Sequence, residues 1–218
     1  MKTKFGEIKF AFLDCSGVIS DDRRPVFRCS QLIAESKGNT LSTNFENAFA
    51  RDKTFDDFLR EQGIELDELS DRQAIFRKYY ELACAEGIVP TIIPGIIPFL
   101  ISIREKGVPM IVISAHLQEF IEREIESYHI TSFFKELKGG TGEEKALVLK
   151  KSCRELKIDP CEAIFFGDMI FDVRSGKEAG VKTVAVTTGY HTKEMLRKEN
   201  PDVLASSLVD AYNQLEIK

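Results

Sequence analysis

The sequence lacks the features that mark a disulfide-stapled, zinc-binding or nucleic-acid-binding protein. Its five cysteines are scattered and form neither a Cys-x-x-Cys pair nor a cluster with histidine. This excludes a disulfide framework and a zinc site of the usual kind. Acidic residues outnumber basic ones by 35 to 30, for a net charge of −5. Such a chain is poorly suited to neutralising nucleic-acid phosphates, so we expect no nucleic-acid partner.

Long apolar runs are also missing. The longest apolar region, residues 88–103, is interrupted by three prolines, a glycine, Thr91 and Ser102, and is too broken for a membrane helix. The first residues are charged, and their apolar run is only Phe10–Leu13, which is shorter than a signal peptide needs. Together with unpaired thiols, these absences predict a cytoplasmic protein with no membrane partner.

The remaining composition is that of a folded globular chain, with 43% hydrophobic and 30% charged residues among 218. This length is enough to bury a hydrophobic core without stabilising disulfides or metal sites. It allows one medium domain, or one domain with a small insertion.

Four short apolar runs predict strands that are covered on both faces. They are Phe10–Leu13, Met110–Ile113, Ala163–Phe166 and Thr183–Val186. Apolar residues recur at helical spacing between them, over residues 98–106, 117–129, 143–156 and 172–179. Strands that alternate with helices predict the α/β class, with a doubly wound parallel sheet.

Residues 21–87 break this alternation, because they show helical patterns only. Helices are expected at residues 30–37, 43–50, 54–62 and 66–86. They predict a small all-α unit inserted after the first strand. Residues 1–20 and 88–218 would then form the α/β core.

Polar residues follow the first three predicted strands: Asp14, Ser114 and Asp168. Ligands of parallel sheets bind beyond the carboxyl ends of the strands, so these side chains should converge. Asp172 adds a third carboxylate, and three carboxylates in one pocket repel each other unless a divalent cation compensates them. Oxygen ligands of this kind suit Mg²⁺. Gly17 permits a turn after Asp14 that is closed to other residues.

At these residues the sequence resembles the haloacid dehalogenase-type hydrolases, which are mostly Mg²⁺-dependent phosphatases. Four motifs match in order. The first is Phe-Leu-Asp-Cys-Ser-Gly-Val at residues 12–18, the second Val112–Ser114, the third Lys145, and the fourth Gly-Asp-x-x-x-Asp at residues 167–172. Residues 89–107 also resemble the phosphoglycolate phosphatase-like branch, whose helical cap domain lies between the first two motifs. The resemblance implies the Rossmann-like core of that family, with residues 21–87 as its cap.

The resemblance also implies roles for the site residues. Asp14 attacks phosphorus and forms an aspartyl phosphate, while Ser114, Ala115 and Lys145 bind the phosphate. Mg²⁺ is held by Asp14, Ser16 through its backbone carbonyl, Asp168 and Asp172. The cap closes over a small phosphorylated substrate and contacts its remaining part.

Ser16 departs from the family pattern, which has a second aspartate two residues after the nucleophile to protonate the leaving group. Serine has no useful acid near pH 7, so Ser16 itself does not supply this contribution, which is roughly 10²–10⁴-fold. Three alternatives stay open. In the first, the chain is a phosphatase in which the substrate or Asp21 or Asp22 replaces that acid. In the second, it cleaves C–P bonds like phosphonoacetaldehyde hydrolases, with Lys37 or Lys53 forming a Schiff base. In the third, it binds a phosphorylated ligand without turnover.

The histidines are interpreted as structural residues or as surface residues. His116 lies two residues after Ser114 and could face the pocket, but a histidine in the first turn of a helix is more often structural. His129 and His191 are expected at the surface.

Overall fold

The computed structural model describes residues 1–45, 48, 55–64 and 69–216. The chain divides into two compact units, Met1–Asp21 with Ile92–Lys218, and Asp22–Thr91. The first unit is an α/β domain and the described part of the second is helical. The predicted fold class, a parallel α/β sheet with a helical insertion after its first strand, is confirmed.

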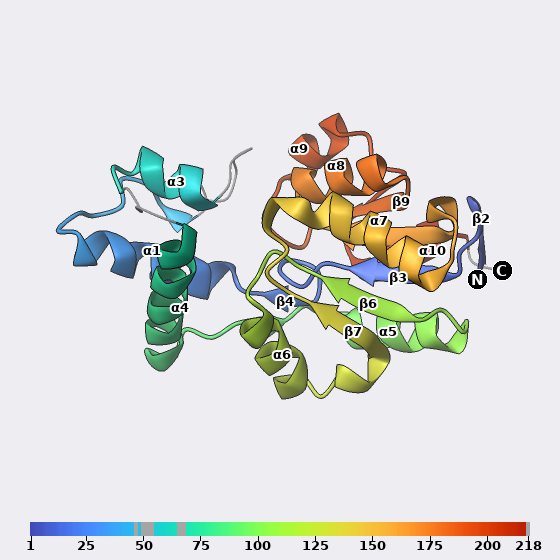
Figure 1. Cartoon of the computed structure of the whole chain (residues 1–218), viewed down its shortest axis with the longest axis horizontal. Helices are drawn as coiled ribbons and strands as arrows, with labels where there is room; N and C mark the ends of the chain where they lie inside the picture. The colour runs from blue at the N-terminus through green and yellow to red at the C-terminus, as the bar shows by residue number, and fades with distance from the viewer. Residues whose placement is uncertain (46–47, 49–54, 65–68, 217–218) are drawn as a thin grey trace. The chain divides into compact units, whose positions relative to one another are not determined.

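The larger unit is built on a six-stranded parallel sheet (Figure 1). The spatial order is β10 (Val203–Ala205), β9 (Lys182–Val186), β8 (Ala163–Gly167), β3 (Phe10–Leu13), β6 (Met110–Ile113) and β7 (Phe134–Lys138). β3 lies in the middle, where Phe12 is opposite Phe165 of β8 and Ile111 of β6. The chain crosses from β7 to β8, so its direction of travel across the sheet reverses beside β3. Open α/β sheets bind ligands at such a point.

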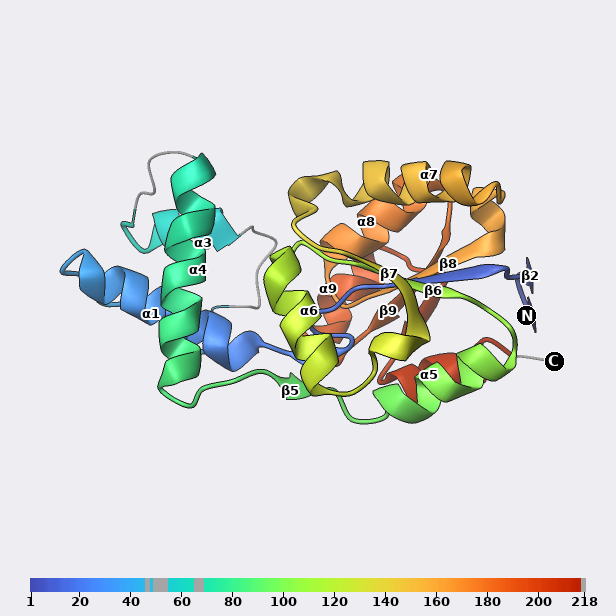
Figure 2. The same cartoon turned by 60° about the horizontal axis from the view of Figure 1, so that its bottom comes forward.

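Helices cover both faces of this sheet, as Figure 2 shows. One face is covered by α5 (Ile96–Glu105), α6 (Gln118–Ser127) and α10 (Leu208–Gln214), and the other by α7 (Lys145–Leu156), α8 (Ile170–Ala179) and α9 (Lys193–Lys198). Side chains alternate between the faces along each strand. In β3, Ala11 and Leu13 join the first core, whereas Phe10 and Phe12 join the second. Burial on both sides explains why these strands are apolar throughout.

The four strands predicted from apolar runs are confirmed, but two sheet strands were missed. β7 has the sequence Phe-Lys-Glu-Leu-Lys and β10 has only three residues. Both lie at edges of the sheet, where side chains are less completely covered and no long apolar run is needed. Two short pairs were also missed: β1 (Lys2–Thr3) with β2 (Gly6–Glu7), and β4 (Ser20–Asp21) with β5 (Thr91–Ile92).

The second unit contains α1 (Arg23–Ser36), α3 (Phe55–Glu61) and α4 (Leu69–Ala85). α1 begins seven residues before the predicted start at residue 30. Its Arg28 forms a two-pronged ion pair with Glu86, at 2.6 and 3.0 Å, and a further contact of 2.8 Å with Glu35. The predicted helix at 43–50 lies partly outside the described residues, and Lys53 lies wholly outside them.

None of the helices in the described part of the chain combines the length and the apolar character that a membrane span requires.

Candidate active site

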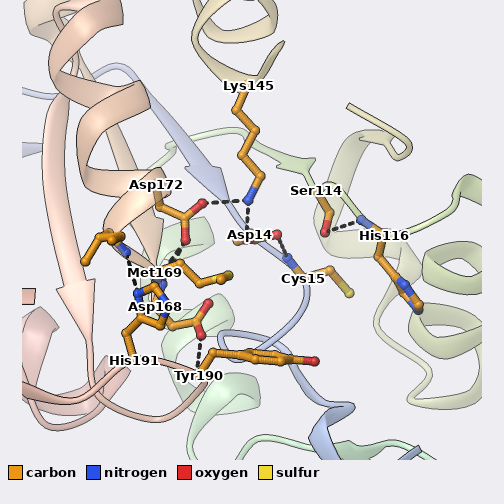
Figure 3. Close-up of polar contacts among 11 residues, drawn as sticks. Asp14, Cys15, Ser114, His116, Lys145, Asp168, Met169, Asp172, Tyr190 and His191 are labelled. Atoms are coloured by element: carbon orange, nitrogen blue, oxygen red, sulfur yellow. Dashed lines mark hydrogen bonds and ion pairs between the residues drawn. The ribbon is translucent and has the colours of Figure 1, made fainter. Parts of the chain in front are cut away.

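The carboxyl ends of neighbouring strands bring the predicted side chains together (Figure 3). Asp14 follows β3, Ser114 follows β6 and Asp168 follows β8, and these three strands are adjacent. Lys145 opens α7, which follows the next strand, β7, and Asp172 lies in the first turn of α8. Because the strands are parallel, all of these residues lie at the same end of the sheet, where the carboxyl ends of its strands meet.

Three carboxylates share one buried position. Asp14, Asp168 and Asp172 are each at most 3% exposed, and each offers an oxygen within 4.8 Å of the others. The Nζ atom of Lys145 forms an ion pair with Asp14 Oδ2 and lies 2.6 Å from Asp172 Oδ1. One ammonium group therefore faces three carboxylates, and their combined charge leaves a need for a divalent cation.

Backbone amides hold one oxygen of Asp14 and one of Asp172. The N–H of Cys15 donates to Asp14 Oδ1 over 2.7 Å. The N–H groups of Asp168 and Met169 donate to Asp172 Oδ2 over 3.1 and 2.9 Å, so this carboxylate also caps α8. In both side chains the second oxygen points to Lys145. The turns after β3 and β8 thus orient the carboxylates toward a common centre.

Asp168 is held in the same way, but its second oxygen has no protein partner. Its Oδ2 accepts the N–H of Tyr190 over 2.6 Å, while its buried Oδ1 accepts no hydrogen bond from the described residues. Two glycines enclose the carboxylate: a Cβ atom would lie 2.2 Å from Oδ2 if added to Gly17, and 2.0 Å if added to Gly189. Gly17 also has a φ of +73°, which favours glycine.

This donor set fits Mg²⁺. The cation prefers carboxylate and carbonyl oxygens, and an unpartnered buried carboxylate oxygen requires a compensating positive group. The structure brings together all three predicted carboxylate ligands. Ser16, whose carbonyl is the fourth predicted ligand, is half-buried in the turn after Asp14 and forms an isolated bridge with Ser20.

The electrostatics reflect this crowding of charge. Burial raises the pKa of Asp14 to about 6, with Lys145 lowering it and Asp172 raising it further. Burial also raises the pKa of Asp168 well above its usual value, and Asp172 and Asp14 add to this effect. Burial alone would lower the pKa of Lys145, but its two carboxylate partners raise it. Lys145 is therefore positively charged near neutral pH.

Ser114 lies next to Asp14, on the side away from Asp168 and Asp172 (Figure 3). Its Oγ accepts the N–H of His116 over 3.3 Å, and its hydroxyl bonds to Asp14, which lowers the pKa of that carboxyl. Ala115 is exposed. The ring of His116 does not point at the carboxylates (Figure 3): its Nε2 lies 3.2 Å from Glu124 on α6, which agrees with the structural interpretation.

Sequence reasoning missed the loop that follows β9. His191 was expected at the surface, and this was wrong: it is 3% exposed, and its Nδ1 accepts the N–H of Ile170 over 2.9 Å. The same loop contains Gly189 and Tyr190, which enclose Asp168. A usable signal was present, since the loop follows the fourth predicted strand. The end of that strand lies beside the ends of the first three, where ligands of parallel sheets bind.

Comparisons with known proteins show which proteins the chain is similar to. A provisional pyrophosphatase, PpaX, from Caldanaerobacter subterraneus is 32% identical over 113 residues, which are 47% of this chain and 49% of that protein. Phosphoglycolate phosphatase from Escherichia coli K12 is 26% identical over 140 residues, covering 62% of this chain and 55% of that protein. The chain thus matches about half the length of these curated relatives.

A solved structure of a haloacid dehalogenase-like hydrolase from Streptococcus pneumoniae superposes with a TM-score of 0.81 at 19% identity. The superposition covers 94% of this chain and 97% of the other, and shows a common fold. The sequence profile described as haloacid dehalogenase-like hydrolase matches residues 12–186, more than half of the 218 residues. The chain therefore belongs to the haloacid dehalogenase-like hydrolase family.

Proposed function

We propose that this chain is a Mg²⁺-dependent hydrolase of a small phosphorylated metabolite and works through an aspartyl phosphate at Asp14. One observation carries the proposal: three buried carboxylates lie together, Lys145 pairs with two of them, and Ser114 lies beside Asp14, the carboxylate that is best placed to attack. The names of the relatives, a pyrophosphatase and a phosphoglycolate phosphatase, support a phosphorylated substrate.

In the proposed reaction, an oxygen of Asp14 attacks phosphorus and the bond from phosphorus to the leaving group breaks. Lys145 and the hydroxyl of Ser114 donate hydrogen bonds to the phosphate oxygens. Water then attacks phosphorus, which releases inorganic phosphate and frees Asp14. Asp14, Asp168, Asp172 and the carbonyl of Ser16 would hold Mg²⁺, which would neutralise the charge that otherwise keeps a carboxylate from a phosphate.

Ser16 restricts the substrates that this site turns over efficiently. Its hydroxyl supplies no proton near pH 7, so the leaving group departs as an anion or is protonated by water or by the substrate itself. The reaction then favours leaving groups of low pKa, such as another phosphate or an acidic phenol. Esters of simple alcohols are expected to react slowly.

The helical unit is proposed to act as the cap. Its predicted span was residues 21–87, and the compact unit of the structure is Asp22–Thr91. A cap of this kind excludes water from the reacting atoms and recognises the part of the substrate beyond the phosphate.

The test is hydrolysis of p-nitrophenyl phosphate, which has a good leaving group, with and without Mg²⁺. Wild type is compared with Ser16→Asp and with Asp14→Asn, which keeps the shape of the nucleophile but not its charge. We expect Mg²⁺-dependent turnover in wild type, a further gain in Ser16→Asp, and none in Asp14→Asn. Equal turnover by wild type and Asp14→Asn would contradict the assigned nucleophile.

Binding without turnover is a second candidate function, and Ser16 is the observation that favours it. In that case wild type is inactive on p-nitrophenyl phosphate although the carboxylates and Lys145 are in place. Activity restored by Ser16→Asp would show that only the acid is missing. Calorimetry with inorganic phosphate in the presence of Mg²⁺ would then measure the binding that remains.

A further inference from the structure

The loop after β9 reaches three separate parts of the proposed metal site. The hydroxyl of Thr188 donates to the carbonyl of Gly17 over 2.6 Å, in the turn that follows Asp14. The N–H of Tyr190 donates to Asp168 Oδ2 over 2.6 Å. Four consecutive residues, 188–191, thereby contact both the first and the fourth sequence motif.

His191 makes the third contact of this loop. Its Nδ1 accepts the N–H of Ile170, the first residue of α8. A helix leaves its first N–H groups without partners inside the helix, and here an imidazole takes one of them. An accepting Nδ1 carries no proton, so the neutral ring has its proton on Nε2. The ring is 3% exposed and stands 6.2 Å from the ring of Phe171.

The position of Ile170 makes this contact important. It lies between Asp168 and Asp172 on the turn that opens α8, and Asp172 caps the same turn through the N–H groups of Asp168 and Met169. Any displacement of this turn moves both carboxylates. Gly189 approaches Asp168 so closely that an added Cβ would lie 2.0 Å from Oδ2, so a shift of the loop toward the site disturbs this carboxylate as well.

We propose that His191 is a positioning residue for the magnesium site, which it orders by holding the first turn of α8 to the loop that fixes Asp168. This inference rests on the proposed metal site and not on turnover. Groups that orient metal ligands typically change metal affinity by about 10- to 100-fold when they are replaced. His191 touches none of the reacting atoms, so its effect should appear in metal binding.

The experiment measures the apparent dissociation constant of Mg²⁺ from thermal unfolding of the metal-free protein over a series of MgCl₂ concentrations, without substrate. His191→Leu removes the acceptor, whereas His191→Asn keeps an oxygen at the place of Nδ1. Thr192→Ala is the matched control. This neighbouring residue caps α9 by accepting the N–H of Met195 over 3.3 Å, so its loss weakens a helix end without touching α8.

We expect His191→Leu to raise the dissociation constant by about 10- to 100-fold, while His191→Asn and Thr192→Ala stay close to wild type. An unchanged constant in His191→Leu, or an equal rise in Thr192→Ala, would overturn the proposal. If His191→Leu does not fold, His191→Gln replaces it, because its longer side chain displaces the acceptor. Wild type without any response to MgCl₂ would overturn the metal site itself, and that outcome is distinct from a failure of His191 alone.

Discussion

Replacement of Asp168 by asparagine tests whether charge governs the carboxylate cluster. The side chain is fully buried, and burial together with Asp172 and Asp14 raises its pKa well above the usual value. Asparagine has nearly the same shape, and its Oδ1 still accepts the N–H of Tyr190. It carries no charge, however. Without Mg²⁺ we therefore expect Asp168→Asn to be at least as stable as wild type, although most substitutions of buried residues destabilise a protein.

Mg²⁺ should reverse this order. A ligand present at 100 times its dissociation constant stabilises the folded state by about 2.7 kcal/mol. For a chain of this length, 1 kcal/mol corresponds to about 2–4 °C in Tm, so the wild-type shift is roughly 5–11 °C. The variant loses the carboxylate whose oxygen has no protein partner. A 100-fold weaker affinity leaves about 0.4 kcal/mol, or about 1–2 °C, at the same Mg²⁺ concentration.

Thermal unfolding followed by circular dichroism, in EDTA and in MgCl₂ at pH 8, measures both effects. Asp210→Asn is the control, because Asp210 lies in the first turn of α10 and accepts hydrogen bonds from Ser206 rather than facing the cluster. It should respond to Mg²⁺ like wild type. A variant Asp168→Asn that is clearly less stable than wild type in EDTA, and that shows the full Mg²⁺ shift, would refute the reasoning.

Other perturbations probe the site and the helical unit. Because burial raises the pKa of Asp14 from 3.8 to about 6, the stability that this group contributes to the metal-free protein is complete below about pH 4 and is lost as the pH rises through 6. Between pH 4 and pH 7, urea unfolding should show the difference in free energy of unfolding between wild type and Asp14→Asn change by about 2 kcal/mol; a constant difference would contradict the shift. Gly189→Ala places a Cβ 2.0 Å from Asp168 Oδ2 and 2.6 Å from Gly17 Cα, so it should cost about 1–3 kcal/mol in thermal unfolding and weaken Mg²⁺ binding. An unchanged Mg²⁺ response would show that the carboxylate has room to move. Arg28→Ala removes an exposed ion pair with Glu86 and should cost at most about 1 kcal/mol, less in high salt; a larger loss in urea unfolding would mean that the pair organises the helical unit.

The central strands could be predicted because burial on both faces requires an unbroken run of apolar residues. β3, β6 and β8 are apolar at every position, so a short run of residues is enough to recognise them. The edge strand β7 has no such run, because it is partly exposed and contains two lysines and a glutamate. Its place in the sheet follows from pairing with β6, which is a contact between residues far apart in the sequence.

The convergence of Asp14, Ser114 and Asp168 could likewise be predicted, because parallel strands end at one edge of the sheet. Their roles in the reaction stay predictions. The surroundings of Asp168 could not be predicted in the same way. Nothing local to Tyr190 or His191 shows that one supplies an N–H to that carboxylate and the other an acceptor to α8.

The sequence by itself determined which residue types follow each strand, and with them the family and the oxygen chemistry of the site. It also determined the replacement of an acid by Ser16. Only the tertiary structure decided which oxygen of each carboxylate is held by backbone and which is left for a cation. For Asp168 that choice depends on the N–H of Tyr190, which lies 22 residues further along the chain, and the direction of this N–H exists only once β8 and β9 have paired.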